Sequence, residues 1–179
     1  SHNAHLVQGI DTAQALRHTG MVTVEHIGRI HIAHMIGGAV AFAGLDGFAN
    51  WYMVQAQEER DHAMLFYTYL QNENMTVTLD AIAKPDKTFT CHMDVLKAGL
   101  EHEKYVTSLI NDIYEAAYNV KDFRTMQFLD WFVKEQGEEE TNANDLITKM
   151  ELFGSDPKSL YMLNQELAAR VYAAPSLVL

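Results

Sequence analysis

The chain has few cysteines, few basic residues and no long apolar run. Cys91 is the only cysteine among 179 residues, so no disulfide can form within the chain, and a reducing compartment is favoured. Thirteen Lys and Arg against 24 Asp and Glu give a formal net charge of −11, which argues against nucleic-acid binding and favours attraction of cations. Neither a signal peptide nor an apolar run of the ~18 residues that a membrane span needs is present. We therefore expect a cytoplasmic protein with no membrane or nucleic-acid partner.

Proline is also scarce, which favours a helical protein. Pro85, Pro157 and Pro175 are the only prolines, and none interrupts a long periodic stretch. The length and the 48% hydrophobic content suit a single all-α domain, which we expect over residues 5–179. Residues 1–4 include no initiator Met and resemble a cloning scar, so we leave them out of the domain.

Helical periodicity and capping signals predict four long helices and a short fifth one. The predicted ranges are residues 12–43, 46–72, 91–118, 122–153 and 157–172. We expect Asp46 to cap the second helix, and Asp156 with Pro157 to begin the fifth. Residues 74–90 have no sustained period and predict a long connection. One short loop, one long crossover and one short turn is the connectivity of a four-helix bundle.

The most informative motif is Glu59-x-x-His62, whose members share one face of the second helix. That face is otherwise apolar, and a carboxylate there is costly unless it is paired, hydrogen-bonded or bound to a cation. The other three long helices also place polar residues at positions where the apolar pattern predicts the core. These are Glu25 on the first, Glu103 on the third, and Gln136 with Glu139 on the fourth. We therefore predict a metal site between the helices.

Carboxylates with one imidazole and no thiolate suit Fe or Mn better than structural Zn, and one carboxylate can bridge two ions. The partner motif is Gln136-x-x-Glu139 and lacks a histidine, so one of two ions would be held more weakly. A second acidic group, Glu58, Glu135 and Glu138, flanks the first and could hold a third cation at the edge of the bundle.

Each of these signals has a plainer interpretation when taken alone. A run such as Glu138–Glu140 is usually a solvated helix face, and a lone His62 is more often a hydrogen-bonded core histidine than a ligand. Their coincidence on four helices favours the metal site. His31 and His34 lie off the Glu25 face, so we predict a surface position or one beside the site, and we assign Cys91 no role.

Three segments resemble the bacterial-type non-haem ferritins. Gly47–Met64 (GFANWYMVQAQEERDHAM) is similar to the second-helix signature of that family. Leu100–Lys104 with Val106 and Thr107 resembles its third helix, and Phe128–Glu140 (FLDWFVKEQGEEE) resembles its fourth. Residues 158–172 are similar to the fifth helix that lines the family's four-fold channels.

The resemblance implies a ferritin-like four-helix bundle that acts as a ferroxidase. Fe(II) would be oxidised by dioxygen or hydrogen peroxide, and the ferric mineral would be stored inside a hollow shell of 24 identical subunits. The implied first iron site is Glu25, Glu59 and His62; the second is Glu59 as bridge, Glu103, Gln136 and Glu139; the third is Glu58, Glu135, Glu138 and Glu139.

Two positions argue against haem, and one departs from the family. A bacterioferritin would have His in place of Glu139 and its haem-ligating Met in place of Arg60. Ile32 stands where the family usually has a tyrosine, which puts the completion of oxygen reduction in question. Two alternatives stay open: a ferritin-superfamily di-iron peroxidase or oxygenase without mineral storage, and a non-catalytic shell protein.

Overall fold

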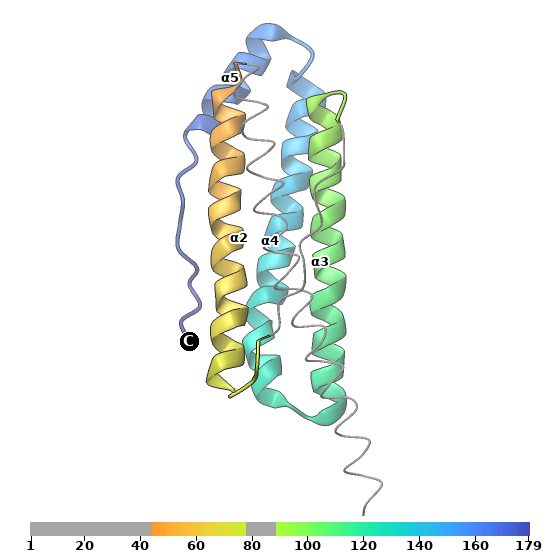
Figure 1. Ribbon diagram of the computed structural model, residues 1–179. Helices are drawn as coiled ribbons and strands as arrows, with labels where there is room; N and C mark the ends of the chain where they lie inside the picture. The colour runs from red at the N-terminus through yellow and green to blue at the C-terminus, as the bar shows by residue number, and fades with distance from the viewer. Residues whose placement is uncertain (1–43, 78–88) are drawn as a thin grey trace, which may run out of the picture.

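The computed structural model describes residues 44–77 and 89–179, which contain four helices and no strand (Figure 1). The helices are α2 (Asp46–Asn72), α3 (His92–Val120), α4 (Phe123–Phe153) and α5 (Pro157–Ala168). The predicted all-α class is therefore confirmed. The helix predicted over residues 12–43, which carries Glu25, His31, Ile32 and His34, lies outside the described residues, as do residues 78–88 of the predicted connection.

The start of α2 differs from the prediction that Asp46 caps it. Asp46 is the first helical residue, and Leu45 at the N-cap makes no side-chain capping bond. The cap comes instead from α5: Asn164 Oδ1 accepts hydrogen bonds from the backbone N–H of Gly47 (2.9 Å) and of Phe48 (3.3 Å). A side chain 117 residues away thus satisfies donors that every helix N-terminus leaves unpaired.

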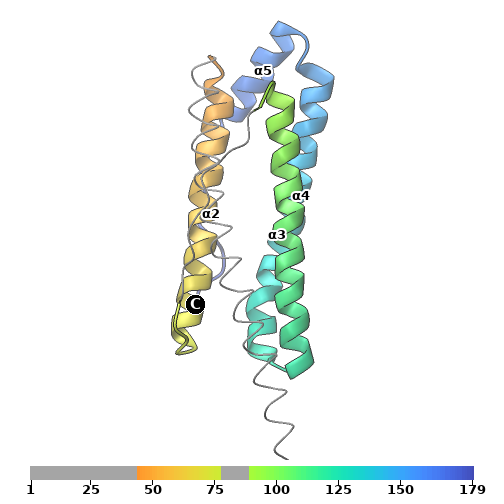
Figure 2. The ribbon, with the colours of Figure 1, turned by 45° about the vertical axis from the view of Figure 1, so that its right-hand side comes forward.

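The predicted turn between α3 and α4 makes them antiparallel neighbours, which lie side by side in Figure 2. Helix α3 ends at Val120, two residues past the predicted end at Tyr118. The next residue, Lys121, adopts the left-handed conformation (φ 60°, ψ 37°), which terminates the helix. Asp122, predicted as the first residue of the next helix, is instead the N-cap of α4: its carboxylate accepts from the Thr125 N–H at 3.1 Å and from the Thr125 hydroxyl at 2.6 Å.

The short helix α5 begins as predicted but ends early. The Asp156 carboxylate accepts from the Ser159 N–H at 2.8 Å, and Pro157 occupies the first turn. The helix ends at Ala168, so the predicted end at Tyr172 is wrong. The following chain runs back along α2 (Figure 1), where the Asn50 side chain donates to the carbonyl oxygens of Leu167 (3.2 Å) and Arg170 (2.9 Å). We call residues 169–179 the C-terminal tail.

Two apolar clusters join the helices at opposite ends of the bundle. The first combines residues of α2, α3 and α4: Phe66, Tyr69, Val106, Leu109, Ile110, Ile113, Phe128, Leu129 and Phe132. The second also includes α5: Phe48, Tyr52, Val95, Leu96, Leu146, Leu163 and Leu167. Between them, α2, α3 and α4 each contribute at least one buried polar residue at mid-length. In the described residues, no helix is long and apolar enough to cross a membrane.

Candidate metal centre

Five residues predicted from the sequence are buried between the two apolar clusters. Their relative exposures are low for polar side chains: Glu59 0%, His62 2%, Glu103 6%, Gln136 1% and Glu139 7%. The sequence places a carboxylate, a histidine or an amide at each point where the apolar face of α2, α3 or α4 is interrupted. In the folded bundle these polar side chains lie at the same height along the helix axes.

Glu59, His62 and Glu139 form the tightest part of this centre. One ligand atom from each residue lies within 4.8 Å of the others, and all three residues are buried. His62 Nδ1 is 3.8 Å from Glu59 Oε2, so the imidazole and the carboxylate face one another along α2. Two carboxylate oxygens and one imidazole nitrogen are a donor set that suits Fe, Mn or Zn ions.

Glu103 and Gln136 lie beside this trio and connect α3 to α4. Gln136 Nε2 is 3.2 Å from the Glu103 backbone oxygen, 3.4 Å from Glu103 Oε2 and 3.3 Å from Thr107 Oγ1. Glu103 is outside the group of three that meet within 4.8 Å, so a cation held by all five residues would need short side-chain adjustments.

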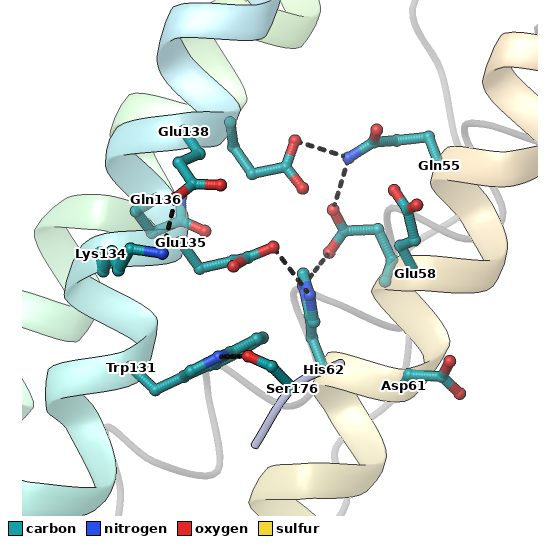
Figure 3. Close-up of polar contacts among 12 residues, drawn as sticks. Gln55, Glu58, Asp61, His62, Trp131, Lys134, Glu135, Gln136, Glu138 and Ser176 are labelled. Atoms are coloured by element: carbon teal, nitrogen blue, oxygen red, sulfur yellow. Dashed lines mark hydrogen bonds and ion pairs between the residues drawn. The ribbon is translucent and has the colours of Figure 1, made fainter. Parts of the chain in front are cut away.

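Aromatic rings fix the plane of the His62 imidazole. The rings of Trp131 (5.4 Å between centroids, 74°) and Phe132 (6.1 Å, 79°) meet it edge to face. Trp131 is itself held by the C-terminal tail, because its Nε1–H donates to Ser176 Oγ at 2.9 Å (Figure 3). The histidine is therefore oriented by packing as well as by its carboxylate neighbours.

The members of the second acidic group have different partners at the edge of the centre. Glu135 Oε1 approaches His62 Nε2 to 3.9 Å, whereas the largely exposed Glu138 pairs with Lys134 at 2.8 Å (Figure 3). Glu58 pairs with Arg170 at 2.5 Å. The third-site residues thus line the same edge of the centre, but two of them already have cationic protein partners.

Electrostatics at this edge favour an added positive charge. Burial is the main cause that raises the pKa of Glu58, the Arg170 guanidinium opposes it, and the Glu139 carboxylate raises it further. Burial also raises the pKa of Glu135, with His62 acting against it and Glu139 in the same direction as burial. Several carboxylates are therefore close enough to disfavour one another's ionisation, and a bound cation would relieve that repulsion.

Gln55 is a residue of the centre that the sequence analysis missed. Its side chain is 6% exposed, and its Nε2 donates to Glu59 Oε1 at 3.1 Å and to Glu139 Oε2 at 2.9 Å. The only signal in the sequence was its position four residues before Glu59, on the same face of the helix.

Arg170 is the second missed residue, and no local pattern pointed to it. Its Nη2 donates to Gln55 Oε1 at 3.0 Å and to Glu58 Oε2 at 2.5 Å, and its guanidinium lies 4.7 Å from the centroid of the Trp51 ring. The residue is 112 positions from Glu58, in a segment that the sequence predicted to be helical. Only the path of the C-terminal tail along α2 brings it to the centre.

Comparison with known proteins gives one consistent family. A family model described as a ferritin-like domain matches residues 33–153. The bacterial non-heme ferritin of Staphylococcus epidermidis is 39% identical over 127 residues, which are 71% of this chain and 76% of the relative. That of Campylobacter jejuni is 36% identical over 121 residues, 68% of this chain and 72% of the relative. An engineered closed form of the Archaeoglobus fulgidus ferritin superposes with a TM-score of 0.85 at 32% identity, covering 89% of this chain and 98% of that one.

Proposed function

The chain belongs to the ferritin family as a relative of the bacterial non-haem ferritins, and we propose that it stores and detoxifies iron by oxidising Fe(II) between α2, α3 and α4. The observation that carries this proposal is the buried trio of Glu59, His62 and Glu139, whose ligand atoms meet within 4.8 Å. Buried acidic groups without a cation are costly, so a divalent ion is the partner that this arrangement suits best.

Iron is the substrate of the proposed reaction. Each Fe(II) gives up one electron, so two irons together, with two protons taken from solvent, reduce one dioxygen to hydrogen peroxide, or one hydrogen peroxide to two waters. The carboxylates favour oxidation because they stabilise the higher charge of Fe(III) more than that of Fe(II). His62 supplies the single imidazole ligand, and the neutral Gln136 holds the product less tightly than a fourth carboxylate would.

We assign the ligands as the sequence suggested. The first iron would be bound by Glu25, Glu59 and His62, and the second by bridging Glu59, Glu103, Gln136 and Glu139. Glu25 rests on the sequence alone, because it lies outside the described residues. A third iron would lie near Glu58, Glu135, Glu138 and Glu139, where it has to compete with the Arg170 and Lys134 pairs.

The proposal includes mineral storage inside a homo-oligomeric shell, for which 24 copies is the family's number. Large apolar side chains near α5 are exposed in the single chain, which supports contact with neighbouring subunits there. They are Leu152 (67%), Phe153 (45%), Tyr161 (63%) and Met162 (64%). The bacterial relatives and the single cysteine support a cytoplasmic location.

Anaerobic loading with Fe(II) followed by air tests the oxidation step. We expect two irons oxidised per chain at the centre, with a transient absorbance from the iron pair, and loss of both in the double variant Glu59→Ala, His62→Ala. Glu101→Ala is the matched control, because Glu101 is exposed on α3 two residues before Glu103. Oxidation at the wild-type rate in the double variant would exclude this centre as the reaction site.

The mass of the iron-loaded particle tests storage separately. A shell of ~24 chains of 20.3 kDa would elute near half a megadalton and retain a ferric core. A monomer or dimer that oxidises iron without retaining it would indicate a di-iron peroxidase or oxygenase instead.

A further inference from the structure

The amide of Gln55 joins two of the three helices that carry the carboxylates. Its Nε2 donates to Glu59 on α2 at 3.1 Å and to Glu139 on α4 at 2.9 Å. A primary amide has two N–H donors on nitrogen, so both are used by carboxylates of the metal centre. A single nitrogen atom therefore bridges these two carboxylates.

Arg170 determines which way that amide points. Gln55 Oε1 faces Arg170 Nη2 at 3.0 Å, on the side opposite the two carboxylates. Turning the amide over would place its oxygen against two carboxylates and its N–H groups against a guanidinium, so that every hydrogen bond would be replaced by a repulsive contact. One orientation is compatible with all three neighbours.

Arg170 is in turn held by contacts outside the centre. Its guanidinium lies over the Trp51 ring at 4.7 Å and pairs with Glu58 at 2.5 Å. Its carbonyl oxygen accepts from the Asn50 side chain at 2.9 Å. The C-terminal tail thus reaches the carboxylates through a defined sequence of contacts, from Arg170 to Gln55 and from Gln55 to Glu59 and Glu139.

We propose that Gln55 and Arg170 are positioning residues for the metal centre, with Arg170 orienting the Gln55 amide and the amide holding Glu59 and Glu139 at the separation that a cation requires. This inference rests on the proposed metal site, and it makes the C-terminal tail part of that site. Outer contacts that orient ligands typically change metal affinity by about 10–100-fold when they are removed.

The test measures Co(II) binding to the full-length protein by calorimetry and by the visible spectrum of the bound ion, which reports ligand geometry without turnover. We expect Gln55→Leu to weaken Co(II) binding about tenfold and to alter the spectrum, because its shape is kept while the amide is lost. Gln57→Leu is the matched control, since Gln57 is exposed two residues away on the same helix.

For the arginine, we expect Arg170→Gln to weaken binding by a similar factor and Arg170→Lys to restore part of it, because lysine keeps the charge but not the planar fork. Arg124→Gln is the control for loss of an ion pair at the C-terminal end of α2, since Arg124 pairs with Glu73, the C-cap residue of that helix, at 2.9 Å on an exposed surface. The melting temperature of each metal-free variant shows that it is folded, and Arg170→Lys remains usable if Arg170→Gln fails to fold.

The double variant decides whether the two residues act in series. If Arg170 works through the amide, adding Arg170→Gln to the Gln55→Leu variant weakens Co(II) binding little further. If the fold-losses in Co(II) affinity of the two single variants multiply in the double variant, Arg170 acts through Glu58 alone, and the proposed order from Arg170 through Gln55 to the carboxylates is overturned. Wild-type binding and spectra in both single variants would overturn the positioning role while leaving the metal site intact, whereas a wild-type protein that binds no Co(II) would overturn the site and this inference together.

Discussion

Replacing Gly47 with alanine should detach α5 from the start of α2. A Cβ at this position would lie 1.7 Å from the backbone oxygen of Asn164 and 2.9 Å from its Oδ1, far inside van der Waals contact. The first of these atoms is main chain, so side-chain rotation cannot relieve the overlap, and α5 has to move away. Moving it breaks the two hydrogen bonds that Asn164 Oδ1 accepts from the N-terminal N–H groups of α2.

The loss in free energy of unfolding can be worked out from those contacts. Each lost hydrogen bond is worth about 1 kcal/mol, and leaving the buried Asn164 side chain without its donors adds about 1 kcal/mol more. A total of about 3 kcal/mol lowers the melting temperature by roughly 6–12 °C for a domain of this size. The assay is thermal unfolding followed by circular dichroism, at one protein concentration because assembly also shifts the midpoint.

Gly99→Ala is the matched control for this change. Gly99 is also helical, but a Cβ there meets nothing within 4 Å. Alanine should therefore raise the melting temperature slightly, since it stabilises a helix by up to about 1 kcal/mol over glycine. If Gly47→Ala melted at or above the wild-type temperature, as Gly99→Ala should, the packing of α5 against α2 described above would be refuted.

Two further predictions concern the helix caps. Asp122→Ala removes the carboxylate that accepts from Thr125 at the start of α4, and should cost about 1 kcal/mol in the free energy of unfolding, seen as a melting temperature lower by roughly 2–4 °C; an unchanged value would show that the cap does not contribute. The hydrogen bonds from Ser159 hold the pKa of Asp156 below its ordinary value of 3.8, so this cap stabilises α5 above that pH and loses its effect as the pH falls through the folded pKa. Asp156→Ala should remove that part of the acid dependence of the melting temperature, and identical pH profiles for the variant and the wild type would contradict this account.

The sequence predicted the ligand-bearing face of each described long helix because local periodicity determines it. Glu59, Glu103 and Gln136 stand out as polar residues in an apolar stripe, and each is at most 6% exposed in the structure. The same reasoning gave the bounds of α2 and α4 to within one residue. A stripe repeats with the turn of its own helix, so it can be recognised without knowing what packs against it.

The features that were missed depend on contacts between distant segments. Asn164 caps α2 in place of Asp46 because α5 folds against that end, and nothing near Asn164 in the sequence indicates this. The helical pattern continues past Ala168, yet the chain leaves the helix there, and the backbone oxygens of Leu167 and Arg170 instead accept from Asn50. Local propensity cannot anticipate such competition, since tertiary contacts decide it.

The position of the centre between two apolar clusters explains how the bundle can hold several buried carboxylates. Burying an ionised group without a cation opposes folding. Two helices that contacted each other only at the site would therefore be driven apart. Here Phe66, Val106 and Phe132 join the helices on one side of it, and Phe48, Leu96 and Leu146 join them on the other. Burial of each such side chain contributes about 1.5–3 kcal/mol, so the helices are held together independently of the carboxylates. The carboxylates can then remain close to one another before any iron binds, and the metal-free chain keeps a site whose acidic groups a cation would stabilise.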